Sequence, residues 1–190
     1  WSRRIEVLGV DRNPAVIAEC ERRTALARLD DVVRFTAAPL EALDASTVGP
    51  IHGMFALHAC DRATCDAIEL GIRLDAELIA VAPCCQAELA HKWSELPEGG
   101  AFAPIHHAPH LRREIGAHVT DMMRVLLLRA AGYQVTAMEF IAPEHTKKNT
   151  LLRANRRGAP DPTALAEYDA LVAATGGCGL QLAASPALRR

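Results

Sequence analysis

Two apolar segments of this sequence each run directly into a cluster of chemically reactive side chains. Met54–Leu57 leads into the first cluster and Leu78–Ala82 into the second. A short apolar run that ends this way is typical of a buried parallel strand at the point where it leaves its sheet. In open α/β sheets, ligands bind outside the carboxyl ends of the strands. We therefore expect two neighbouring strands with a shared site, formed by His58, Cys60, Asp61, Cys84, Cys85 and Gln86.

The remaining periodicity predicts strands that alternate with helices. Strands are expected over residues 5–10, 32–36, 50–57, 78–82, 133–141 and 150–154, and helices over 14–29, 63–74, 86–93, 111–131 and 162–174. Residues 94–109 contain five Pro or Gly residues and are expected to form a loop. Only eight residues join the last two strands, too few for a crossover helix, so that pair should be antiparallel. The fold class is therefore α/β, with a Rossmann-like, mostly parallel sheet that ends in an antiparallel strand pair.

Side-chain spacing predicts which helix faces are buried. In the helix over 63–74, the residues available for burial are Ala67, Ile68, Leu70 and Leu74. In the helix over 111–131, the residues spaced to share one face are Ile115, Val119, Met122 and Leu126.

Composition fits an ordinary globular protein. The 190 residues suffice for one domain with a sizeable core, and 50% of them are hydrophobic. The formal net charge of -2 provides no overall basic field for nucleic acid, although a local patch could suffice. No run approaches the roughly 18 apolar residues of a membrane span. The six cysteines show no secreted disulfide framework, so we expect reduced thiols and a cytoplasmic location.

The first predicted strand ends in an acidic residue, Asp11. Pro14 then suits the first turn of a helix, which Asn13 or Asp11 can cap. In nucleotide-binding sheets, an acid at a strand end typically accepts hydrogen bonds from ribose hydroxyls. Asp11 is therefore either a ribose ligand or an ordinary helix cap.

Several short motifs together resemble a known family. The chain is similar to the class I S-adenosylmethionine-dependent methyltransferases, whose sheet ends in such a hairpin. More narrowly, it resembles a methyltransferase-domain family related to a tRNA ribose methyltransferase. The motifs that carry the resemblance are Leu57-His-Ala-Cys-Asp61, Ala63-Thr64, Pro83-Cys-Cys-Gln86, Thr120-Asp121 with Arg124, and Glu144-His-Thr-Lys147 with Asn149. One departure is Cys65, which stands where the family has an acid, although Asp66 follows it.

The resemblance implies a cofactor, an acceptor and a set of site residues. The cofactor is S-adenosylmethionine, and the acceptor is expected to be RNA, with small molecules and proteins as alternatives. Cofactor contacts are implied for Asp11, Arg12, Ala38, Pro39, Leu57 and His58. Catalytic positions are implied for His58, Cys60 and Asp61, and substrate contacts for Pro83, Cys84, Cys85, Gln86, Thr146, Lys147 and Asn149.

The family's glycine-rich cofactor loop should precede Ile5, where this sequence does not contain it. That loop lets the backbone approach the cofactor closely. We therefore expect an N-terminally truncated methyltransferase domain over residues 1–157, followed by a C-terminal helix and tail over 158–190 that pack on it or extend it. The chain as it stands should bind S-adenosylmethionine poorly. The competing hypothesis is a non-catalytic domain that binds RNA or protein and keeps only the fold.

The roles of His58 and Asp61 each have a structural alternative. His58 could remove a proton from an acceptor hydroxyl or amine near neutral pH, or it could be a partly buried histidine at a strand end. Asp61 could act in the site, but we expect it to cap the helix that begins at Ala63. Methyl transfer depends mainly on alignment and a desolvated site, so no single residue need be indispensable.

Cys60, Cys84 and Cys85, together with His58, are residue types that bind zinc. Adjacent cysteines are not the usual ligand spacing, and thiols are often buried as small hydrophobic groups. We therefore expect no metal. Basic residues that could hold RNA phosphates, if they lie on one face, are Arg112, Arg113, Lys147, Lys148, Arg153, Arg156 and Arg157.

Overall fold

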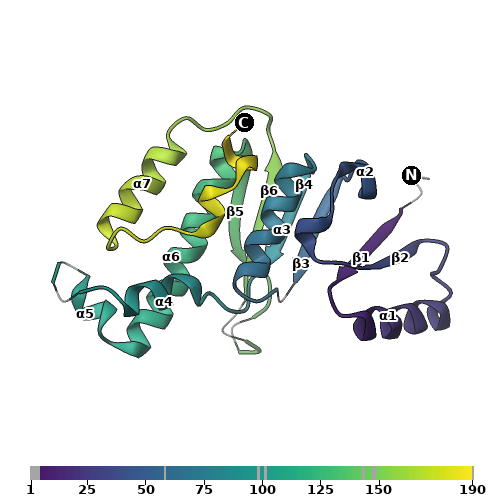
Figure 1. Cartoon of the computed structure of the whole chain (residues 1–190), viewed down its shortest axis with the longest axis horizontal. Coiled ribbons are helices and arrows are strands. Elements are labelled where there is room, and N and C mark those ends of the chain that lie inside the picture. Colours follow the sequence, from purple (N-terminus) through teal and green to yellow (C-terminus); the bar gives the residue numbers. More distant parts are fainter. Residues whose placement is uncertain are drawn as a thin grey trace. The chain divides into compact units, whose positions relative to one another are not determined.

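The computed structural model describes residues 5–57, 59–97, 99–100, 102–142, 144–146 and 149–189, and it leaves out the side chain of Arg189. Within it the chain forms two compact units, Trp1–Gly49 and Pro50–Arg190. Figure 1 labels the elements of both units.

The first unit is built on two parallel strands. β1 (Val7–Asp11) pairs with β2 (Val33–Ala37), and the register places Asp11 beside Ala37. α1 (Pro14–Ala27) connects them, so the three elements form a β-α-β unit. A short 3-10 turn, η1 (Leu40–Ala42), and α2 (Ala45–Val48) complete the unit.

Two local features of the sequence explain this geometry. Pro14 occupies the first turn of α1, and Asn13 caps the helix because its Oδ1 accepts a hydrogen bond from the Ala15 N–H at 3.0 Å. Gly9 lets the ring of Phe35 cross β1, since a Cβ at position 9 would lie 2.5 Å from that ring. The side-chain cap expected from Asn13 or Asp11 is therefore supplied by Asn13.

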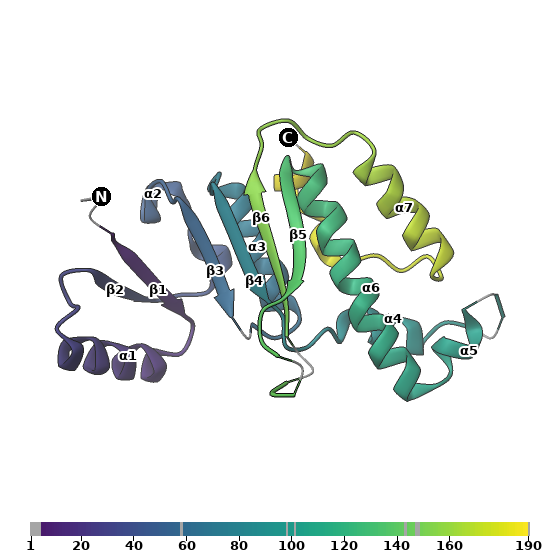
Figure 2. The same cartoon turned by 180° about the vertical axis from the view of Figure 1, so that it is seen from behind.

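The second unit contains a four-stranded mixed sheet. Its strands are β3 (Gly53–Leu57), β4 (Leu78–Ala82), β5 (Tyr133–Glu139) and β6 (Thr150–Arg156), in the spatial order β3-β4-β6-β5. β3 and β4 are parallel, whereas β6 runs antiparallel to both of its neighbours. Figure 2 shows this sheet from behind. The antiparallel pairing expected for the last two strands is confirmed.

Helices cover one face of this sheet. α3 (Arg62–Arg73) packs on β3 and β4, while α6 (Pro109–Ala130) packs on β5 and β6. α4 (Glu88–Ser94), α5 (Ala103–His106) and α7 (Ala164–Ala174) surround α6, and the tail adds two 3-10 turns, η2 (Gln181–Ala184) and η3 (Pro186–Arg189). The large apolar side chains of the fully buried centre include Ile68, Ile79, Leu89, Trp93, Met123, Leu127, Leu128 and Leu152.

β3 has one buried face and one exposed face. Met54 and Ala56 pack against the core, while Phe55 and Leu57 are 65% and 60% exposed. The period of two in a strand produces this alternation. β4, by contrast, is buried from Ile79 onward because it lies inside the sheet.

The predicted face of α3 is confirmed, whereas that of α6 is confirmed for Val119, Ile115 and Leu126 and wrong for Met122. All four apolar residues named for α3 are buried. On α6, Met122 is 53% exposed, and the buried face instead includes Thr120, Asp121 and Arg124. Asp121 and Arg124 are buried because they bond to each other and to the segments after β3 and β4, while the Thr120 hydroxyl donates to the Gly116 carbonyl of the same helix. The expected loop over 94–109 also contains a short helix, α5.

The α/β fold class is confirmed by these elements and pairings. Among the helices of the described part of the chain, none combines the length and apolar character needed to cross a bilayer.

Candidate functional site

The two apolar segments that lead into reactive side chains are neighbouring parallel strands, as expected. Leu57 at the end of β3 is aligned with Ala82 at the end of β4. The segments that follow the two strands therefore leave the sheet side by side at its carboxyl edge. This is the edge at which ligands bind in open α/β sheets.

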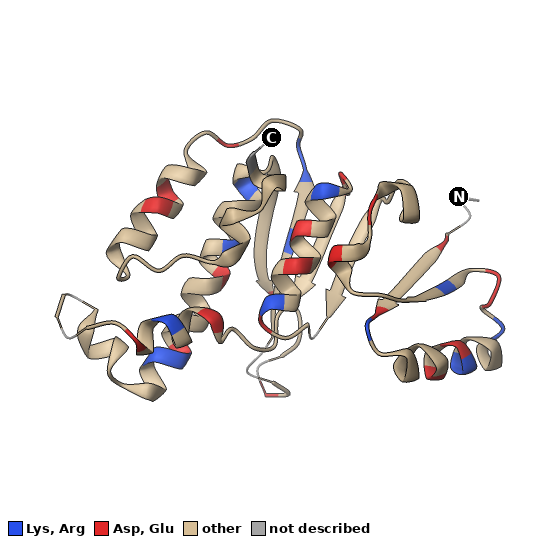
Figure 3. Cartoon of the chain, viewed as in Figure 1, with Lys and Arg blue, Asp and Glu red and all other residues tan. Residues whose placement is uncertain are grey.

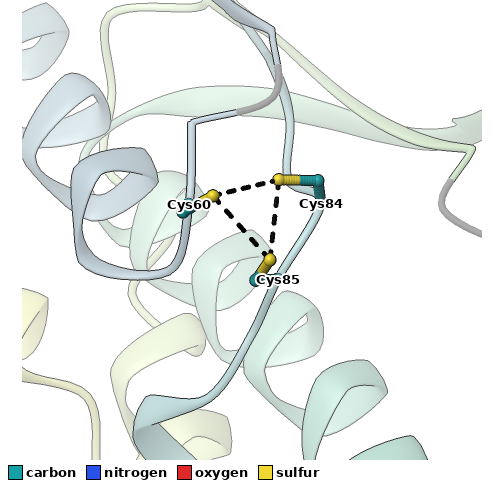
Figure 4. A group of neighbouring side chains, drawn as sticks. All are labelled: Cys60, Cys84 and Cys85. Carbon is teal, nitrogen blue, oxygen red and sulfur yellow. Dashed lines mark hydrogen bonds between the residues drawn. The ribbon is translucent and has the colours of Figure 1, made fainter.

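Three thiols meet at this edge and form what we call the thiol cluster: Cys60, Cys84 and Cys85. The Cys60 and Cys84 sulfur atoms are 3.4 Å apart, Cys84 and Cys85 are 3.7 Å apart, and Cys60 and Cys85 are 3.8 Å apart. Figure 4 shows the three sulfur atoms facing one another from two separate loops. Cys60 and Cys85 are exposed and Cys84 is half-buried, and all six cysteines of the chain are thiols. Adjacent positions in the sequence therefore do not prevent Cys84 and Cys85 from sharing one cluster.

Asp61 joins the two loops that carry the thiol cluster. Its backbone N–H donates to the Cys85 carbonyl at 3.0 Å. Its Oδ1 accepts hydrogen bonds from the N–H groups of Ala87 at 2.9 Å and Glu88 at 3.0 Å. The expectation that Asp61 caps the following helix is wrong: its side chain makes no capping bond to α3 and instead caps the start of α4. Proximity in sequence suggested the wrong helix.

The backbone of Asp61 is strained by this connection. Its φ is 47° and its ψ is -103°, a combination that a residue with a Cβ rarely adopts. Such conformations cost about 1–3 kcal/mol and persist only where surrounding contacts impose them. The bonds to Cys85, Ala87 and Glu88 are contacts of that kind.

A buried charged group lies beneath the two loops. Arg124 of α6 is fully buried, and its Nη2 donates to the Asp61 carbonyl at 2.8 Å. Its Nη1 pairs with Asp121 at 2.9 Å, and Gln86 Nε2 donates to the other Asp121 oxygen at 2.8 Å. Arg124 also contacts the Cys65 sulfur at 3.4 Å. The network thus ties α6 to the segments after both β3 and β4.

Burial controls the ionisation of several of these groups. Burial raises the pKa of the Cys84 thiol to about 12, and hydrogen bonding to Cys60 and Cys85 acts in the same direction. Burial also raises the pKa of Cys65, although the nearby Arg124 opposes that effect. The pKa of Asp121 is raised by burial as well, again opposed by Arg124. Cys84 is therefore a neutral thiol near pH 7 and not an unaided nucleophile.

The hairpin between β5 and β6 opens at the same edge of the sheet. Because Val81 pairs with Leu152 in antiparallel register, β6 starts where β4 ends. Asn149 is buried there, and its Nδ2 donates to the Ile141 carbonyl at 2.9 Å. Of the predicted substrate residues, this edge therefore carries Pro83, Cys84, Cys85, Gln86 and Asn149, with the half-buried Thr146 in the hairpin loop.

In the first unit, the predicted cofactor residues also gather at a strand edge. Asp11 ends β1, and its backbone carbonyl accepts a hydrogen bond from Ala38 N–H at 3.1 Å. Arg12 and Pro39 are the exposed next neighbours of these two residues. Asp11 Oδ1 accepts a bond from Asn13 N–H at 2.7 Å, which orients the carboxylate. The geometry thus brings Asp11, Arg12, Ala38 and Pro39 together within this unit.

Two predicted site residues, His58 and Lys147, lie outside the described residues, as does Lys148. Sequence reasoning gave no role to Asp121 and Arg124 beyond the motif that contains them. The sequence feature that could have identified this pair is its spacing, because oppositely charged residues at positions i and i+3 of a helix lie close enough to pair.

Of the basic residues considered for RNA, several that the structure describes are engaged with neighbouring groups. Arg156 ends β6 at the edge opposite the thiol cluster and pairs with Asp75 at 2.5 Å, and Arg157, which follows the strand, bonds to Gln134. Arg112 donates to the His106 carbonyl at 2.6 Å. Figure 3 shows acidic and basic positions interspersed on the helices of the second unit.

Comparison with known proteins connects this geometry to methyl transfer. Residues 2–92 match the family model of a methyltransferase domain. Among solved structures, the chain is similar to an O-methyltransferase family protein from Burkholderia thailandensis, with a TM-score of 0.41 and 14% sequence identity. That match covers 82% of this chain and 52% of the other, so this chain spans about half the length of that protein. No curated protein sequence matches the chain.

Proposed function

We propose that this chain transfers a methyl group from S-adenosylmethionine to an acceptor, with RNA as the acceptor class. The single observation that carries the proposal is the match of residues 2–92 to a methyltransferase domain. This stretch runs from β1 into α4. It therefore includes both groups of predicted site residues, the one that follows β1 and β2 and the one that follows β3 and β4. The RNA acceptor rests on the resemblance to tRNA ribose methyltransferases.

The residues at the end of β1 suit the nucleoside of this cofactor. One carboxylate oxygen of Asp11 is oriented by the Asn13 N–H, and a carboxylate has further lone pairs that can accept bonds from ribose hydroxyls. Ala38 and Pro39 offer small, mostly apolar surface for an adenine ring. Asp11, Arg12, Ala38 and Pro39 would thus hold the nucleoside, and we assign Leu57 and His58 to the cofactor as well. The bound cofactor would supply an activated methyl group on a sulfonium.

The residues after β3 and β4 are assigned to catalysis and the acceptor. His58 is proposed as the base that takes a proton from the acceptor, because imidazole is suited to that role near pH 7. Asp61 uses one carboxylate oxygen to hold α4, so we assign it to positioning this edge. Cys60, which directly precedes Asp61, is assigned to the catalytic positions as well. Contacts with the acceptor are proposed for Pro83, Cys84, Cys85, Gln86, Thr146, Lys147 and Asn149.

Calorimetry and a methyl-transfer assay on the full chain test this proposal. S-adenosylmethionine should bind weakly, and Asp11→Ala should weaken that binding by a further factor of about 10 to 150, because a hydrogen bond to a charged group contributes roughly 1.5–3 kcal/mol. Asp31→Ala is the matched control, since Asp31 is an exposed carboxylate of the same unit. Equal binding by the Asp11 variant would refute the ribose assignment.

Transfer of labelled methyl groups to a pool of small structured RNAs tests the reaction itself. The label should be lost after ribonuclease treatment, and His58→Ala should lower kcat more than it changes cofactor affinity. If the label resists ribonuclease, the acceptor is a protein or a small molecule and not RNA. RNA binding without any affinity for the cofactor would support the non-catalytic binding domain instead.

A further inference from the structure

Although ligand spacing in the sequence predicted no metal, we propose that the thiol cluster of Cys60, Cys84 and Cys85 binds one thiophilic metal ion, with Zn²⁺ as the ion that fits its geometry. The proposal rests only on the arrangement of three side chains within the second unit, and it can fail or hold separately from methyl transfer. Cys84 and Cys85 are the same residues that are assigned above to the acceptor. Among the described residues, these three sulfur atoms are the group that lies close enough together to hold a metal ion. All three are within 4.8 Å of one another.

The sulfur triangle has the dimensions of a thiolate site. A tetrahedral zinc ion about 2.3 Å from each sulfur requires sulfur atoms about 3.8 Å apart. The observed separations are 3.4, 3.7 and 3.8 Å. A point about 2.3 Å from all three sulfur atoms lies about 0.9 Å above their plane, against about 0.8 Å in an ideal tetrahedron. An ion can therefore bind with little movement of the side chains.

The loops that present the thiols are held in place from several directions. Asp61 bonds to the Cys85 carbonyl and to the start of α4, and Arg124 bonds to the Asp61 carbonyl. These contacts fix Cys60 and Cys85 relative to each other in the absence of an ion. Supporting interactions of this kind orient metal ligands and commonly change affinity by about 10- to 100-fold.

Ligand chemistry selects the class of ion. Three thiolates are soft ligands, which favour Zn²⁺ or Cu⁺ over Mg²⁺ or Ca²⁺. The three described ligands leave one tetrahedral position for water or an exchangeable ligand. Three protein ligands with an open fourth position are the arrangement found in catalytic zinc sites, whereas structural sites use four. Binding requires loss of the thiol protons, so affinity should rise with pH.

Titration of the reduced, metal-free chain with Co²⁺ and Zn²⁺ tests the site. Co²⁺ should give the sulfur-to-metal charge-transfer band and the visible bands of a tetrahedral thiolate complex at about one equivalent, and Zn²⁺ should displace it. Each of three single variants should lower the affinity for the metal by at least about 100-fold, which is the loss that removal of a mere supporting group can cause. These variants are Cys60→Ser, Cys84→Ser and Cys85→Ser. The controls are Cys20→Ser and Cys178→Ser, which lie outside the cluster.

A thermal readout separates loss of the site from loss of the fold. Zn²⁺ should raise the Tm of the wild-type chain and of both controls, and should leave the Tm of folded cluster variants unchanged. Absence of the charge-transfer band in a wild-type chain whose six cysteines are all shown to be reduced would overturn the proposal. Metal binding that survives Cys60→Ser unchanged would overturn it equally. So would a Cys60–Cys84 disulfide that re-forms while Zn²⁺ is present in excess.

Discussion

Arg124 Nη2 donates a hydrogen bond to the backbone carbonyl of Asp61 across 2.8 Å, although the two residues are 63 positions apart in the sequence. The guanidinium is fully buried and also pairs with Asp121. A buried cation therefore holds the strained residue that joins the two loops of the thiol cluster. Stability and the geometry of the candidate site are coupled through this bond.

Removing the guanidinium should destabilise the second unit strongly. Arg124→Met leaves the Asp121 carboxylate buried without its charge partner, and breaking a buried pair in this way costs about 3–5 kcal/mol. The free energy of unfolding, measured in urea, should fall by that amount. Arg113→Met on the exposed side of the same helix should change it by less than about 0.5 kcal/mol. The double variant Arg124→Met with Asp121→Leu should recover much of the loss; no recovery would show that the pair is not the source of the effect.

Substitutions of Asp61 should separate its cap from its backbone strain. Asp61→Ala removes the bonds to Ala87 and Glu88 and should cost about 0.5–2 kcal/mol, as other lost helix caps do. Asp61→Gly loses the same cap but relieves the positive φ of 47°, so it should be more stable than Asp61→Ala. Asp61→Asn keeps an acceptor oxygen and should be the mildest change. If Asp61→Gly were the least stable of the three, the strain would not be real.

The ion pair between Arg129 and Asp161 should make stability depend on acid pH. Bonds from Thr163, followed by the bond from Arg129, lower the pKa of Asp161 to about 2. Because the folded pKa lies below the unfolded value of about 3.9, this contribution is present above about pH 4 and is lost as pH falls toward 2. The Tm difference between wild type and Asp161→Asn should shrink over that range. Asp169→Asn, on the exposed side of α7, should show no comparable change.

Gly71 should be intolerant of a methyl group, unlike Gly116. A Cβ at position 71 would lie 2.8 Å from Ile79 Cδ1, whereas at position 116 it would meet Ala90 Cβ at 3.3 Å. Both changes gain about 1 kcal/mol of helix propensity, but overpacking at Gly71→Ala should cost about 1–3 kcal/mol. Unfolding in urea should therefore rank Gly71→Ala below Gly116→Ala by about that difference. The reverse ranking would mean that α3 can shift on the sheet.

Much of the fold could be predicted from local patterns. β4 was predicted with the bounds it has, because a fully buried strand is a continuous apolar run between turn signals. The antiparallel hairpin followed from the length of its connection. The buried face of α6 could be predicted only in part, because Arg124 and Asp121 are buried through bonds to distant segments. The spacing of apolar residues predicted that Met122 is buried, but Asp121 and Arg124 are buried and Met122 is exposed.

The candidate site was predicted in location but not in its contacts. The repeated strand endings correctly predicted that the segments after Leu57 and Ala82 are neighbours. That Cys84 and Cys85 both reach Cys60 depends on how the loop turns after β4, which motif spacing does not encode. Likewise, the bond between Asp61 and Glu88 joins residues 27 apart in sequence and is invisible to capping rules that apply to adjacent residues.

The long-range bond between Arg124 and Asp61 has a consequence for the newly made chain. Cys85, the last cysteine of the cluster, precedes Arg124 by 39 residues (124 − 85). At about 5–20 residues per second, the ribosome needs roughly 2–8 s to add them. During that interval the three thiols have been synthesised but the side chain that holds their loops has not. The nascent chain therefore passes through a period in which its cysteines can pair wrongly or be oxidised, and a reducing environment during translation should raise the yield of correctly folded protein.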